Sequence, residues 1–363
     1  MKTAGILFAA ALLCVALPSK AQEMKKYEFT VKKTLPVTPV KDQNETGTCW
    51  DFATTALLES EAIRINGITD PALYPDFSEI YTVWKSYEER LVKYIRTDGK
   101  ISTGPGSLAP DLLHIVKDYG IVAQNAMPGL LEKPNHRALD KEVREFMKLI
   151  EGSDSLLRYS DWKNDFRAIL RKHLGECPET FVVDGKEYTP AEYRDLYKIN
   201  PDDYITIASF THVPFYKEFI TDVADNWRWD SAWNVPLEDL MRICYEAIEK
   251  GYTFAWDADM SEPTWLKCGI AYLPDADLPV TQESRQRAYD LKYTVDDHLM
   301  QIYGTAVDQA GHKFFVVKNS WGPETGDYGG DWFASEDYVA CKTLQITLHR
   351  DAVPADILAR LKK

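Results

Sequence analysis

A single cysteine, Cys49, lies where a polar, turn-forming segment meets a helix pattern. Thr46 to Thr48 precede it, and from Trp50 apolar residues recur at helical spacing until Gly67 ends the pattern. The first turn of a helix has unpaired backbone N–H groups and a partial positive charge, and both stabilise a thiolate. The position therefore indicates a nucleophile, although a small buried hydrophobe at the start of a core helix would also fit.

A cysteine nucleophile needs a base, and the base needs a group that orients it. His298 opens a strand pattern after the acidic turn TVDDH, and Asn319 ends the next one with an amide that can accept from an imidazole N–H. His114 lies inside a helix pattern, which is more typical of a structural residue. Spacing alone does not choose among the seven histidines, which are His114, His136, His173, His212, His298, His312 and His349.

The order of four elements resembles the papain-like cysteine peptidases: Gln43 six residues before Cys49, then Trp50, then His298, then Asn-Ser-Trp-Gly from Asn319. The resemblance implies an α+β, two-lobed papain-like fold. Its helical lobe would carry Cys49 and pack on a β-rich lobe that carries His298 and Asn319. It also implies that the cleft lies between these lobes.

The resemblance also implies roles for these residues. The Cys49 thiolate would attack the scissile carbonyl, and His298 would protonate the leaving amine while Asn319 orients its ring. The Gln43 amide and the Cys49 backbone N–H would hold the oxyanion. Trp321 would shield the hydrogen bond between His298 and Asn319 from water.

Two departures identify the branch within that family. Thr46 stands where secreted papain relatives have a further cysteine, and too few residues precede Gln43 for an inhibitory propeptide. From Cys49 to His298 the chain runs 249 residues, whereas papain relatives need about 130–150. Both departures resemble the bleomycin hydrolase and aminopeptidase C branch, which has an enlarged helical part and no propeptide.

That branch usually acts as an aminopeptidase, because its C-terminal arm lies in the cleft and its terminal carboxylate meets the substrate's α-amino group. This chain ends DAVPADILARLKK, so Lys362 and Lys363 weaken the local negative charge. From the usual activity of the branch we nevertheless expect an aminopeptidase acting on peptides. The alternatives are a papain-like endopeptidase or dipeptidyl peptidase, or a non-catalytic secreted binding protein that retains the fold.

The resemblance places substrate-backbone binding at Gly106 and Ser107, where the wider family has two glycines. A serine at this point keeps a backbone available, and we expect it to narrow the pocket.

The elements expected around these residues are segregated along the chain. Helix patterns come first, and short strands dominate from residue 252 onward, as in an α+β protein. The helices are expected at 50–66, 110–119, 161–173, 190–198 and 234–250, and the strands at 252–256, 298–308, 312–321, 329–335 and 343–349. One peptidase domain would span 22–363, with a helical insertion at about 126–234 and a C-terminal tail at 350–363.

The first 21 residues read as a signal peptide, with Lys2, an apolar run from Ala4 to Leu17, and small residues before a cleavage site after Ala21. We therefore expect an exported protein, periplasmic or extracellular. No other stretch approaches transmembrane length. Cleavage removes Lys2 and Lys20, so the formal charge moves from −14 to −16, which argues against nucleic acid and anionic membranes as partners.

The remaining cysteines leave pairing open. In an oxidising compartment up to two disulfides could form among Cys177, Cys244, Cys268 and Cys341. No cysteine and histidine spacing is typical of zinc, so neither a metal nor a cofactor is expected. A homo-oligomer is compatible with the resemblance but does not follow from the residues.

Overall fold

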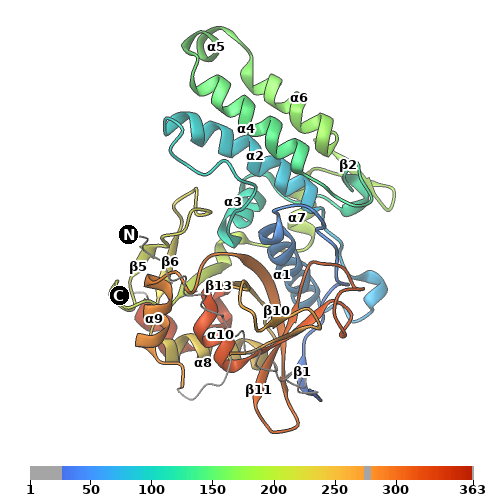
Figure 1. Cartoon of the computed structure of the whole chain (residues 1–363). Coiled ribbons are helices and arrows are strands. Elements are labelled where there is room, and N and C mark those ends of the chain that lie inside the picture. The colour runs from blue at the N-terminus through green and yellow to red at the C-terminus, as the bar shows by residue number, and fades with distance from the viewer. Residues whose placement is uncertain (1–26, 274–278, 362–363) are drawn as a thin grey trace, which may run out of the picture.

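The computed structural model describes residues 27–273 and 279–361. The predicted signal peptide and the terminal residues Lys362 and Lys363 lie outside these ranges. Figure 1 shows a helical half above a β-rich half, with α1 where the two meet. The helices are α1 (Cys49–Asn66), α2 (Glu79–Arg96), α3 (Ala109–Tyr119), α4 (Arg137–Glu151), α5 (Asp154–Tyr159), α6 (Trp162–Leu174), α7 (Pro190–Leu196), α8 (Leu237–Lys250), α9 (Gln282–Asp290), α10 (Glu336–Lys342) and α11 (Ala355–Leu361).

The strands form one large sheet and a separate hairpin. They are β1 (Thr30–Thr34), β2 (Phe181–Val183), β3 (Lys186–Tyr188), β4 (Tyr204–Ala208), β5 (Glu218–Ile220), β6 (Ser231–Asn234), β7 (Phe254–Ala258), β8 (Trp265–Leu266), β9 (Ile270–Ala271), β10 (His298–Val307), β11 (Lys313–Lys318), β12 (Asp331–Ser335) and β13 (Thr343–His349). The large sheet has the order β5-β6-β4-β13-β7-β10-β11-β12-β9-β8, with β1 paired to β10, and β2 pairs with β3.

Helix α1 confirms the expected helix, and Cys49 is its first residue. Gly67 closes it in the left-handed conformation, with φ 61°, and its N–H donates to the Arg64 carbonyl. Most of the helix from Trp50 to Ile63 is buried, because it packs on other helices on one side and on the sheet on the other. A helix held on all sides is a rigid support for a reactive residue at its first turn.

The two faces of the large sheet have different helical partners. Leu299 of β10 and Ala255 of β7 belong to the core shared with α1. The alternating residues Met300 and Trp256 belong to the core shared with α8 and α11. Because side chains alternate along a strand, Asp257 points to the same face as Ala255, toward α1.

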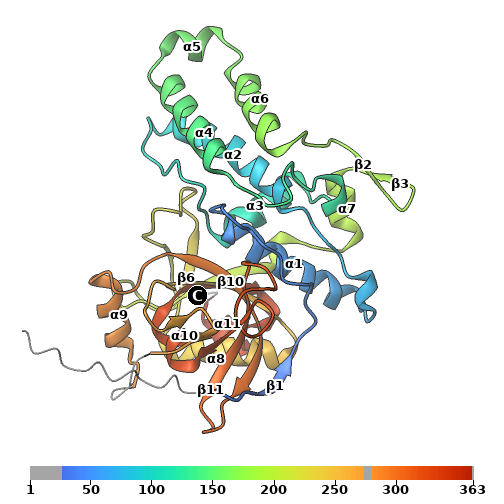
Figure 2. The ribbon, with the colours of Figure 1, turned by 45° about the vertical axis from the view of Figure 1, so that its right-hand side comes forward.

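The range 126–234, predicted to be a helical insertion, contains both helices and strands. Helices α4, α5 and α6 stand with α2 apart from the sheet, as Figure 2 shows. After residue 203 the chain returns to the large sheet, where β4 pairs with β13. The prediction did not include these strands, and it did not include α2, which begins at the capping residue Ser78.

The described part of the C-terminal tail is packed on α8. Arg242 of α8 bonds to Asp356 at 2.7 Å, and the Arg360 guanidinium lies over the Tyr216 ring. Leu361 is buried in the core on the α8 face of the sheet. Among the described residues, no helix combines the length and the apolar content needed to cross a membrane.

The disulfides considered from the sequence do not form. Cys177, Cys244, Cys268 and Cys341 are all free. Three of them belong to three different cores: Cys177 packs with the helical half, Cys244 with the α8 face, and Cys268 beside β9. Side chains held in separate cores cannot meet without backbone movement.

Candidate active site

Cys49 lies at the first turn of α1, beside the start of β10. The backbone N–H groups of Leu299 and Trp50 favour its thiolate, as expected at a helix start. Leu299 directly follows His298, so the pairing of α1 with β10 brings the nucleophile next to the predicted base. The site therefore joins residues that are far apart in sequence.

Burial disfavours the charged form of Cys49 and of His298 when each is considered alone. Burial, together with the charges of Asp296 and Asp257, raises the pKa of the Cys49 thiol to about 12. Burial lowers the pKa of His298 to about 4, against a smaller opposite effect of its hydrogen bond to Asn319. A thiolate here is therefore stable only with an imidazolium beside it, because each charge then compensates the other.

The His298 ring is held by two groups. Its Nε2 lies 2.8 Å from the Asn319 Oδ1, and the Trp321 ring stacks on it with centroids 4.9 Å apart. Because Nε2 is occupied by Asn319, Nδ1 is the nitrogen left to exchange a proton with Cys49. Trp321 covers the imidazole, where the resemblance placed a shield.

Gln43 is buried and its amide is fixed from both ends. Its Nε2 donates to the Thr46 carbonyl at 2.9 Å, and its Oε1 accepts from the Ser320 hydroxyl at 2.6 Å. An amide nitrogen carries two N–H groups, so one remains for an oxyanion. The Gln43 backbone N–H also donates to the Ser320 carbonyl, at 2.8 Å.

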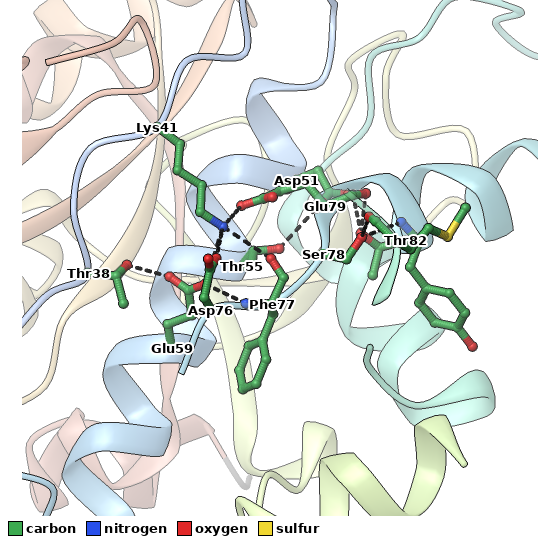
Figure 3. A network of polar contacts seen from close by, with 12 residues as sticks. Thr38, Lys41, Asp51, Thr55, Glu59, Asp76, Phe77, Ser78, Glu79 and Thr82 are labelled. Carbon is green, nitrogen blue, oxygen red and sulfur yellow. Dashed lines mark hydrogen bonds and ion pairs between the residues drawn. The ribbon is translucent and has the colours of Figure 1, made fainter. Parts of the chain in front are cut away.

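A buried polar network holds the segment that leads into Gln43. We call it the lysine cluster; it consists of Lys41 with the carboxylates of Glu59, Asp76 and Glu79. Figure 3 shows the Lys41 ammonium among these acids, together with its bond to the Phe77 carbonyl. Burial lowers the pKa of Lys41, but the charges of Glu79, Glu59 and Asp76 outweigh it and raise the pKa overall. The cluster ties the Gln43 segment to α1 and α2.

The predicted substrate-binding pair, Gly106 and Ser107, lies on the loop before α3. The Ser107 hydroxyl donates to Asp111 at 2.5 Å and accepts from the Trp227 indole at 2.6 Å, and the residue is 3% exposed. The expectation that Ser107 narrows the pocket is therefore wrong, because its side chain points into the interior. A Cβ on Gly106 would lie 1.8 Å from the Asp225 Oδ2, so a carboxylate packs directly on this glycine.

Three kinds of residue at the site were not predicted. Ser320 fixes the amide of Gln43, Lys41 anchors its segment, and the acids Asp257 and Asp296 lie near the cysteine. The sequence did carry one signal, the acidic turn TVDDH just before His298. The other contacts depend on pairings between distant segments.

Comparisons with known proteins identify the family of this chain. A protein-family model described as Peptidase C1-like family matches residues 10–363. Aminopeptidase W of Lactobacillus delbrueckii subsp. lactis is 24% identical over 95% of this chain and 88% of the relative. Aminopeptidase C of Lactococcus lactis subsp. cremoris is 22% identical over 88% of this chain and 83% of the relative.

A solved structure shows the same fold. It is that of pepw from Lactobacillus rhamnosis HN001, with a TM-score of 0.72 and 19% identity, covering 92% of this chain and 84% of that one. The likeness confirms the predicted fold class.

Proposed function

Because this chain belongs to the Peptidase C1-like family, which confirms the resemblance seen in its sequence, we propose that it is a cysteine-dependent aminopeptidase that removes residues from the free N-termini of peptides. The observation that carries the proposal is the 2.8 Å bond between His298 and Asn319, beside the first turn of the helix that starts at Cys49. The similar proteins named above are aminopeptidases, which supports the exopeptidase assignment.

The first half of the reaction is acylation of the enzyme. The Cys49 sulfur gives its proton to the Nδ1 of His298 and attacks the carbonyl carbon of the scissile peptide bond. The carbonyl oxygen takes the negative charge. It accepts hydrogen bonds from the free N–H of the Gln43 amide and from the backbone N–H of Cys49. The tetrahedral intermediate then collapses, the C–N bond breaks, and His298 protonates the leaving amine.

The second half is hydrolysis of the thioester. His298 removes a proton from water, which attacks the thioester carbonyl, and the proton returns to the Cys49 sulfur as the amino acid leaves. Asn319 accepts a hydrogen bond from the Nε2–H group of His298 throughout, which keeps the Nδ1 of His298 directed at the reacting atoms. The sequence of steps leaves the enzyme unchanged and requires no metal.

The experiment compares two fluorogenic substrates, an aminoacyl coumarin amide with a free amine and its N-acetylated form. Wild type is expected to hydrolyse the free form at least about 100-fold faster in kcat/KM, as a charge-assisted contact allows. Cys49→Ala is expected to lower hydrolysis of the free form to background. Equal cleavage of the two substrates would exclude an aminopeptidase, and activity in Cys49→Ala would exclude the mechanism.

We also propose that the protein is exported and acts in the periplasm or outside the cell. The support is the N-terminal sequence, with its lysine, apolar run and cleavage site after Ala21. The N-terminal residue of the mature protein, determined from cell fractions, is expected to be Gln22 in the exported fraction. A chain that keeps Met1 and stays in the cytoplasm would overturn this proposal.

A further inference from the structure

A buried carboxyl group whose hydrogen-bond partner is another acid lies near the nucleophile. Asp257 of β7 is 1% exposed, and in the sheet it is paired with Leu299 on one side and with Gln345 on the other. Neither of its oxygens receives a hydrogen bond from an N–H or hydroxyl group of the described residues. A buried acid that no N–H group or cation contacts is costly, so a cationic ligand at this place would stabilise it.

Asp296 approaches the same group from the loop before His298. The carboxyl groups of Asp296 and Asp257 share a hydrogen bond, which requires one proton between them, and the pair then carries one negative charge. Both acids are near enough to Cys49 for their charges to raise its pKa. Asp296 is half-buried, so the pair is open on one side.

A third acid reaches the pair from the segment between β5 and β6. The Asp225 carboxylate packs on Gly106, and its charge raises the pKa of both Asp257 and Asp296. Thr221 of the same segment donates to the Gln345 side chain at 3.0 Å, which anchors the segment over the sheet face that carries Asp257. Three separate elements therefore direct carboxyl groups to one place.

Cations do not neutralise this group within the described chain. No lysine, arginine or histidine of the described residues lies within 4 Å of the three carboxylates in an ion pair. Arg90 lowers the pKa of Asp225 by its charge, but burial is the larger effect and the pKa is raised overall. Arg90 itself donates to the Gly106 carbonyl at 2.5 Å. The group therefore keeps negative charge that no ion pair of the described chain neutralises.

The substrate of an aminopeptidase brings that charge to this place. In an N-terminal residue, the α-nitrogen is two bonds from the scissile carbonyl carbon, about 2.5 Å away from standard bond lengths. When Cys49 attacks this carbon, the ammonium group must therefore lie within a few ångströms of the sulfur. Asp257 and Asp296, whose charges act on the Cys49 thiol, are therefore close enough to this position to attract the ammonium group by their charge.

We propose that Asp225, Asp257 and Asp296 form the site that binds the α-ammonium group of the substrate's N-terminal residue. We call these three residues the amine site. The inference rests on the proposed function and assigns its selectivity to this site. The resemblance assigns this role to the C-terminal carboxylate, which lies outside the described residues; α11, the helix before it, packs on α8, on the sheet face opposite Asp257.

The test replaces one acid at a time with Asp257→Asn, Asp296→Asn and Asp225→Asn. For each variant kcat/KM is measured on the free and the N-acetylated coumarin substrate. We expect a loss of about 10- to 100-fold on the free substrate, the range of one charge-assisted hydrogen bond, and a change of less than about 3-fold on the acetylated one. The loss should appear mainly in KM.

Two control variants separate charge from structure. Asp222→Asn changes an exposed acid of the same segment as Asp225, and its selectivity should equal that of wild type. Asp296→Glu keeps the charge and should retain most of the selectivity. Labelling of Cys49 by a thiol-directed epoxide, measured by mass spectrometry, shows that the nucleophile of each variant is intact.

The outcomes distinguish this inference from the proposed function. If wild type does not discriminate between the two substrates, the aminopeptidase assignment fails. If wild type discriminates and all three asparagine variants discriminate equally well, the amine site is wrong while the aminopeptidase stands. A chain shortened by Lys362 and Lys363 that loses the discrimination would then assign it to the C-terminal carboxylate.

Discussion

Two groups of three carboxyl groups lie near α1, and they differ in one respect. The lysine cluster contains its own cation, since the Lys41 ammonium lies 2.7 Å from Glu79 and from Asp76. The amine site contains none within 4 Å in the described chain. Both groups include acids that are almost completely buried, Glu59 in the first and Asp257 in the second, each 1% exposed.

The difference separates a structural from a functional use of the same side chains. A buried charge that is paired inside the protein fixes the position of the segments that carry it. A buried charge left unpaired keeps an electrostatic deficit that a ligand can satisfy, and such groups collect at functional sites. By this criterion the lysine cluster positions Gln43, and the amine site selects the substrate.

Removal of the cation from the lysine cluster should have the largest effect on stability. In Lys41→Met, Glu59 and Glu79 remain buried without their cation, although Glu59 keeps the hydrogen bonds from Thr38 and Phe77, so we expect a loss of about 3–5 kcal/mol in the free energy of unfolding. Urea denaturation measures it. Lys117→Met is the matched control, because Lys117 pairs with Asp202 on the surface, where both are more than half exposed, and it should cost less than about 1 kcal/mol. Equal losses in the two variants would contradict the structural role of the cluster.

Removal of a charge from the amine site should act in the opposite direction. Asp257→Asn replaces a buried acid whose partner is another acid by a neutral amide, which can donate to Asp296, so we expect the free energy of unfolding to rise by about 1 kcal/mol. The same variant should lose selectivity for free amines. A gain in stability together with a loss of function is expected for a site where an unfavourable buried group is needed for binding.

Asp51 provides the contrast for this prediction. It is buried as completely as Asp257, but its carboxylate accepts hydrogen bonds from Thr55 and Thr82. Asp51→Asn should therefore destabilise the protein by about 1–2 kcal/mol. If both asparagine variants shift the urea midpoint in the same direction, hydrogen bonding does not decide the effect.

Much of the fold followed from local pattern. The helix after Cys49, the helix before Gly251 and the four C-terminal strands β10 to β13 were predicted, because periodicity and glycine stops are properties of short stretches. Three of the four predicted catalytic residues lie at the ends of such elements, Cys49 and His298 at their starts and Asn319 directly after β11, whereas Gln43 lies in the loop before α1. Their roles remain predictions until activity is measured.

The missing parts depend on pairing between distant segments. Ser320 acquires a role only because residues 41–43 lie alongside residues 320–322. Asp257 is a strand residue like others until β7 pairs with β10 and places it opposite Leu299. For Ser107 the residue type suggested a pocket wall, and only the positions of Asp111 and Trp227 show that its hydroxyl points inward.

The pH dependence of stability should also distinguish the two groups. Burial, with the charge of Asp225, raises the pKa of Asp296 to about 7, so its contribution to stability is complete at low pH and is lost as pH rises through 7. Between pH 6 and 8 the wild type should lose about 1 kcal/mol relative to Asp296→Asn. The pKa of Lys41 is raised above its ordinary value, so its ammonium group stays charged throughout this range. Urea denaturation at both pH values tests this, and parallel curves for wild type and variant would refute it.

The smallest effect is expected inside the lysine cluster itself. Asp76 and Glu79 lie at the same distance from the Lys41 ammonium, but the Asp76 side chain is 59% exposed and that of Glu79 is 4% exposed. Water and salt screen an exposed pair, so Asp76→Asn should cost less than about 0.5 kcal/mol. Glu79→Gln should cost about 2 kcal/mol, because it weakens a buried charged hydrogen bond. Equal costs in urea denaturation would mean that the number of charges around Lys41, and not their burial, determines how much the lysine cluster stabilises the protein. The contrast with the amine site would then have no physical basis.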